Sequence, residues 1–161
     1  MDDDQDQGAR RGLSATHGDA NERLKALHPE GARALARLDA AAWEAADSSL
    51  LGLCSLRIAQ LLGNELPVYA DSPAIDASKI DSLGAWDTSA LFTHADRAHL
   101  EFTEQFVTSV GDVTSEQVDA LLEYGSAEDV RSFVGALYVV ELSQRVDIVA
   151  RVVLRQEGSI T

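Results

Sequence analysis

The chain of 161 residues is long enough for one domain with a substantial core, and its hydrophobic content of 45% favours a packed globule over a disordered chain. Its 27 acidic and 13 basic residues give a formal charge of -14, which repels phosphate backbones and anionic lipid, so we expect no nucleic acid and no membrane among its partners. No apolar run approaches the roughly 20 residues of a membrane span. The N-terminal stretch MDDDQDQGARRGLS lacks the apolar core of a signal peptide, and we therefore expect a cytoplasmic protein.

The chain divides by composition into a short tail and one domain. Residues 1–26 are polar, include an acidic DDD run and show no hydrophobic periodicity. We expect them to form an acidic tail that is disordered or weakly helical, followed by a single domain over residues 27–161.

The first two predicted elements are helices. Pro29 can open a helix in which apolar residues recur at three- and four-residue steps through an alanine-rich stretch. Asp47 or Ser48 can cap a second helix, which Gly63 is placed to end.

Further helices follow along the rest of the chain. A short helix is predicted from Asp76 to Gly84, then a loop over 85–92 that contains two aromatic anchors. Additional helices are predicted from Thr93 to Gly111, over TSEQVDALLEY behind a capping box of Thr114 and Gln117, and from Ser126 to about Leu154. No β-hairpin signal occurs. The fold class is therefore predicted to be all-α, a bundle of about six to seven helices.

Three stretches in this order resemble one known family. They are LLGLCSLRIAQLLGN, AWDTSALFTHADRAHLEFTEQF, and the pattern E-x-x-Q-R-x-D from Glu141 to Asp147. Together they resemble the carboxymuconolactone decarboxylase-like superfamily, in particular its alkylhydroperoxidase AhpD-like branch, over roughly Ala32 to Leu154. The resemblance implies an AhpD-like helical bundle over the domain.

The resemblance also implies where a peroxidase site would lie. Active members carry a C-x-x-C pair after the glycine that ends the LRIAQLLG-type helix, a histidine beyond that pair and a glutamate before it. These groups reduce a peroxide, form a disulfide and move protons. In this sequence the two cysteines fall on Asn64 and Pro67, the histidine falls on Asp71 and the glutamate falls on Gly52. All four reacting positions are therefore replaced.

Cys54 is the one thiol that could keep a redox function. On a helix its neighbours at three- and four-residue steps include leucine and isoleucine, so we expect a small buried side chain. A peroxidase that uses Cys54 alone stays open as an alternative, with Arg57 as the nearest base that could lower the thiol pKa.

The decarboxylase branch offers a second enzymatic alternative, because its members need no cysteine. In this sequence Glu65 is acidic at roughly the position of a family glutamate, while Asp71 again replaces the histidine. Two such carboxylates could act as acid and base if burial raised one pKa. The competing interpretation is a pair of solvated loop acids.

The histidines and glycines give no sign of a metal or cofactor. His94 and His99 are five residues apart, which is not the spacing of metal-binding helices, and we expect His94 in a helix cap and His99 with Asp96 in a surface pair. No glycine-rich phosphate loop occurs. We expect no metal site and no cofactor.

A polar set interrupts the apolar pattern of the last helix. It comprises Glu141, Gln144, Arg145 and Asp147. One interpretation is an internal network that lines a pocket or a subunit contact. The other is a solvated helix face with one ion pair between Glu141 and Arg145.

Two function hypotheses remain from the sequence. The favoured one is a non-catalytic AhpD-like protein, a structural or regulatory subunit that forms a homo-oligomer or joins a C-x-x-C-bearing relative, since the resemblance implies association through helical faces. The other is an enzyme of the same superfamily that uses Cys54, or Glu65 and Asp71.

Overall fold

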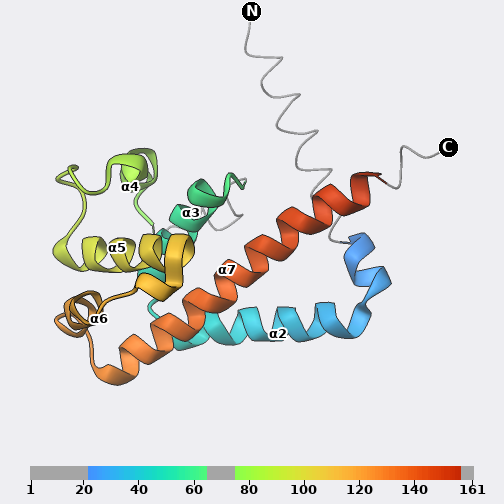
Figure 1. Cartoon of the computed structure of the whole chain (residues 1–161), viewed down its shortest axis with the longest axis horizontal. Coiled ribbons are helices and arrows are strands. Elements are labelled where there is room, and N and C mark those ends of the chain that lie inside the picture. The colour runs from blue at the N-terminus through green and yellow to red at the C-terminus, as the bar shows by residue number, and fades with distance from the viewer. Residues whose placement is uncertain (1–21, 65–74, 157–161) are drawn as a thin grey trace, which may run out of the picture. The chain divides into compact units, whose positions relative to one another are not determined.

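The computed structural model describes residues 22–64 and 75–156, and it confirms the all-α class (Figure 1). Residues 22–27 are helical, and they include the last positions of the predicted tail. The elements that follow are α2 (Pro29–Ala45), α3 (Ser48–Leu62), α4 (Ala77–Ser82), η2 (Leu83–Ala85), α5 (His94–Ser109), η3 (Val110–Asp112), α6 (Ser115–Leu122) and α7 (Ala127–Gln156). The described residues hold no strand.

Both ends of α3 are fixed by local chemistry, as the sequence predicts. Asp47, rather than Ser48, is the N-cap, and its carboxylate accepts hydrogen bonds from the backbone N–H groups of Ser49 and Leu50. At the other end Gly63 has a φ of 63°. Its N–H and that of Asn64 close the helix onto carbonyls of the last turn, which is the Schellman arrangement.

Two of the predicted helices end differently from expectation. The short helix after Asp76 stops at Ser82 and continues as η2, and the helix after Thr93 stops at Ser109 and continues as η3. Gly84 and Gly111 therefore lie inside 3-10 turns instead of ending α-helices. A tightened last turn is a common way to satisfy the terminal carbonyls of a helix.

Contacts divide the chain into two units, which we describe separately. The larger unit spans residues 38–144, and its core is built around α3, which packs against α5. Nearly every residue of α3 from position 51 to 59 is buried. The two expected aromatic anchors of the loop are confirmed, because Phe92 is buried in this core and Trp86 packs against it.

The smaller unit contains the described residues 22–37 and 145–156, and it has little core of its own. Ala150 is the one residue there that is buried, and Leu24 packs against it. Large apolar side chains of this unit are instead exposed: Leu27 at 61%, Val149 at 58%, Val152 at 58% and Val153 at 54%. None of the helices in the described part of the chain is both long and apolar enough to cross a bilayer.

Replacing Gly63 with alanine is expected to destabilise the larger unit by about 1 kcal/mol, because a Cβ is strained at positive φ. The measurement is the free energy of unfolding from urea titration. Gly111→Ala is the matched control, since nothing lies within 4 Å of a Cβ built there and its φ is not positive. Equal effects of the two substitutions would contradict the assigned role of Gly63.

Candidate functional site

Gly52 is the position at which the resemblance implies a catalytic glutamate. Side chains from outside α3 occupy the space beside it. Gly52 lies within the buried part of α3. A Cβ built on it would come within 2.7 Å of Ile75 Cδ1 and within 3.9 Å of the Trp43 ring. The Ile75 side chain would therefore have to move before any larger residue could occupy position 52.

The turn that would carry the thiol pair is described only at its first residue. Asn64 directly follows Gly63, and its backbone N–H donates to the Ala59 carbonyl at 2.8 Å. Glu65, Pro67 and Asp71 lie outside the described residues, and the roles considered for them stay predictions.

Cys54 is fully buried, which confirms the expected small apolar role in packing. Burial raises the pKa of its thiol to about 12, and a hydrogen bond with Thr103 offsets only part of that rise. The thiolate is the nucleophilic form of cysteine, so this side chain is protonated and unreactive near neutral pH.

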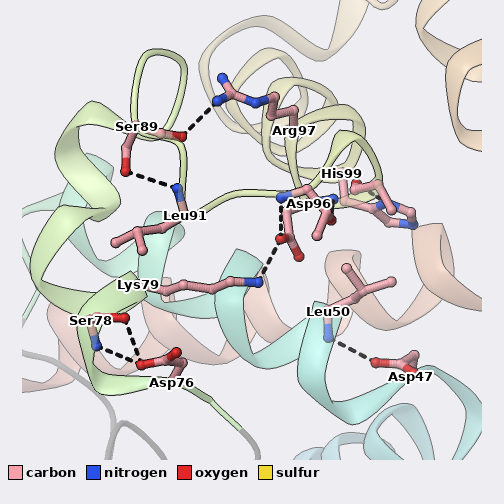
Figure 2. A network of polar contacts seen from close by, with 12 residues as sticks. Asp47, Leu50, Asp76, Ser78, Lys79, Ser89, Leu91, Asp96, Arg97 and His99 are labelled. Atoms are coloured by element: carbon pink, nitrogen blue, oxygen red, sulfur yellow. Dashed lines mark hydrogen bonds and ion pairs between the residues drawn. The ribbon is translucent and has the colours of Figure 1, made fainter.

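A buried carboxylate lies close to this thiol, at the start of α5. Asp96 is 6% exposed, and its carboxylate accepts hydrogen bonds from the Lys79 ammonium at 2.6 Å and from the Thr93 backbone N–H at 2.8 Å (Figure 2). In return the Thr93 hydroxyl accepts from the Asp96 N–H, which completes a capping box. Burial alone would raise the Asp96 pKa, but these hydrogen bonds together with the Lys79 charge hold it below its ordinary value.

His99 and Asp96 were expected to form a surface pair, and this is wrong. His99 is 8% exposed, its Nδ1 lies 2.8 Å from the Ala95 carbonyl, and its ring meets that of Phe133 edge to face with centroids 4.7 Å apart. Burial lowers the His99 pKa, although the Ala95 carbonyl and two nearby carboxylates oppose this. The imidazole is therefore neutral near pH 7. The reason for the error is that Asp96 takes its partner from α4, so neither group needs solvent.

A second polar cluster connects the aromatic loop over residues 85–92 to α3 and α5. One oxygen of Glu104 accepts from Arg57 Nε at 2.7 Å and from Trp86 Nε1 at 2.6 Å. Arg97 donates to the backbone carbonyls of Asp87 and Ser89. Arg57, the base considered as an activator of Cys54, is thus engaged by Glu104.

Two members of the predicted polar set of α7, Gln144 and Asp147, have defined partners. Gln144 is buried and donates from Nε2 to the Ser55 carbonyl at 2.9 Å and to the Ser55 hydroxyl at 3.0 Å. Asp147 pairs with Arg151 at 3.3 Å. Glu141 is half-buried and Arg145 is exposed. Gln144 is therefore internal, and the lining of a pocket or a subunit contact by this set stays a prediction.

One interaction that the sequence analysis missed, the capping box of Thr93 and Asp96, has a recognisable sequence pattern. The spacing T-x-x-D from Thr93 to Asp96 is that of a capping box, which could have indicated the role of Asp96. Lys79 and Asp96 are 17 residues apart, and Arg57 and Glu104 are 47 apart, so no local pattern could pair them.

Most of these buried polar groups are held by one another, whereas the buried Gln144 Oε1 accepts no hydrogen bond from the described residues. The carboxylate of Asp96 is held by an ammonium and a backbone amide, and the Cys54 thiol is protonated. Among the described residues no group of three or more His, Cys, Asp or Glu side chains is placed to hold a metal ion.

Comparison with known proteins does not identify a family. No protein-family model matches the chain, and no curated protein matches it.

Asp96→Asn is expected to destabilise the protein by about 3 kcal/mol at pH 7, because it leaves the largely buried Lys79 ammonium without its counter-charge. The substitution should also change how the free energy of unfolding depends on pH in the acid range. The pKa of Asp96 in the folded protein is below its ordinary value of 3.8. The stabilisation of the folded state by the Asp96 carboxylate is therefore present above pH 3.8 and is lost as pH falls through the folded pKa.

The measurement is urea unfolding of wild type and variant at pH 7 and at several values below pH 4. The variant should lose less stability on acidification than wild type. Asp119→Asn, at an exposed position on α6, is the control and should change little. An unchanged acid profile in Asp96→Asn would contradict the assignment.

Gly52→Ala is expected to be more favourable by about 1 kcal/mol in an Ile75→Val background than in wild type, because valine lacks the Cδ1 atom that meets the new methyl group. A double-mutant cycle from urea unfolding measures this coupling. Gly135→Ala on α7 is the control, since nothing lies within 4 Å of a Cβ there. Coupling that is absent, or equal for both glycines, would refute the proposed contact.

Proposed function

We propose that the chain is a non-catalytic protein of the AhpD-like type that acts as a structural or regulatory subunit of an oligomer. The observation that carries the proposal is the state of Cys54, the one thiol in the chain, which is fully buried and has a pKa raised to about 12. A peroxidase of this type needs an exposed thiolate and a second thiol to resolve the sulfenic acid.

The surroundings of Gly52 support the same proposal. A catalytic carboxylate at this position would need the space that Ile75 Cδ1 fills. Trp43 lies on the same side, so the helix face at position 52 serves packing.

The oligomeric part of the proposal rests on exposed apolar surface. The smaller unit buries Ala150 alone among its described residues, and four of its large apolar side chains are more than half exposed. Short helices in water depend on burial of an apolar face for most of their stability. A partner chain, either a second copy or a C-x-x-C-bearing relative, would supply that burial.

Peroxide reduction tests the non-catalytic assignment directly. With a lipoyl or thioredoxin-type dithiol as reductant, the protein is expected to consume hydroperoxide no faster than its Cys54→Ser variant. In parallel, an aromatic disulfide reagent should leave the native thiol unmodified and should label one thiol per chain after unfolding in urea. Turnover that disappears in Cys54→Ser would overturn the proposal.

A further inference from the structure

A buried histidine lies at the contact between α5 and the first half of α7, within the larger unit. His99 is on α5 and is 8% exposed. Its ring meets the Phe133 ring of α7 edge to face, with centroids 4.7 Å apart. Phe133 also packs against Phe102 of α5, with centroids 6.3 Å apart. We call these three rings the aromatic contact.

The surroundings of His99 define where its protons can lie. Nδ1 is 2.8 Å from the Ala95 carbonyl oxygen, which can only accept, so Nδ1 carries the proton of the neutral ring. A second proton therefore goes to Nε2. No described residue offers Nε2 an acceptor. An imidazolium would thus lie against apolar rings with one of its two N–H groups unmatched by the described residues.

Two carboxylates near His99 favour its charged form, but both have other partners. They belong to Asp96 on α5 and to Asp47, the N-cap of α3 (Figure 2). Asp96 is held by Lys79, and Asp47 accepts from backbone amides at the start of α3. Burial outweighs both carboxylates and lowers the pKa of His99.

The neighbouring helices bring no buried charge to the aromatic contact. Phe133 is preceded on α7 by a turn of polar residues, and α6 packs against α5. The charged residues of α6, and those of α7 up to Phe133, are all exposed: Glu116, Asp119, Glu128, Asp129 and Arg131.

We infer that His99 makes the attachment of α7 acid-sensitive: a proton on Nε2 weakens the contact with Phe133, and the first half of α7 loosens from α5. This inference goes beyond the proposed function and does not depend on it. The neutral ring packs on Phe133 without a charge to solvate, whereas the imidazolium is solvated when the two helices separate. The opening is local, because α3 and α5 remain joined by contacts of their own.

The direction of the pH effect follows from the pKa of His99. The exposed ring of the open form titrates near 6.5, and the ring of the closed form titrates below that value. The stabilisation of the closed form by neutral His99 is therefore fully present above pH 6.5 and is lost as pH falls toward the folded pKa. Asp39 acts in the opposite direction, because burial raises its pKa and acidification then favours the folded form.

Hydrogen exchange of the full chain tests the inference. Mass spectrometry follows the backbone amides of residues 127–144 at about pH 7.5 and about pH 5.5, and each rate is compared with that of the unfolded chain at the same pH. Protection of this segment is expected to fall severalfold at the lower pH. The ordinary histidine pKa of 6.5 sets a ceiling of about tenfold. Protection of α3 should fall less.

His99→Gln is expected to remove the pH dependence of protection in residues 127–144. His94→Gln, at an exposed position on the same helix, is the matched control and should retain it. If His99→Gln does not fold, an NMR titration of wild-type His99 keeps the test decisive, because its pKa must lie below 6.5. Protection that does not change with pH, a pH dependence that persists in His99→Gln, an equal fall across α3, or a His99 pKa at or above 6.5 would each overturn the inference.

Discussion

The carboxylate of Asp96 is the polar group that joins α4 to the start of α5 within the larger unit. It accepts hydrogen bonds from the backbone N–H of Thr93, the N-cap of α5, and from the ammonium of Lys79 on α4. A buried carboxylate is unfavourable unless each such partner is present, so its burial requires both elements to be in place. The same helix then brings Thr103 to Cys54 and Glu104 to Arg57, and α3 is enclosed as a result.

The enclosure of α3 accounts for the raised pKa of the Cys54 thiol. A reactive thiol needs a partly exposed position with positive charge nearby, whereas close packing of an apolar helix removes both water and charge. Cys54 is at the centre of that packing, and the nearest base in sequence is taken by Glu104. The Cys54 thiol contributes instead to packing between α3 and α5, where it contacts Thr103.

Local signals in the sequence predicted most of the helix ends. Asp47, Gly63 and the pair of Thr114 and Gln117 act through their own turn, so their roles can be deduced without the fold. The failures are long-range. The spacing of Asp96 and His99 fits a solvated face, and nothing nearby in sequence reveals that Lys79 and Phe133 enclose them.

The close approach of Ile75 to Gly52 has a consequence for substitutions in the core. A larger residue at position 52 requires either a smaller residue at position 75 or a different position of the Ile75 side chain, because both side chains would occupy the same volume. Introduction of a carboxylate at position 52 would therefore require a compensating change at position 75. A change of chemistry on the buried face of α3 is thus coupled to the packing of a residue more than twenty positions away in sequence.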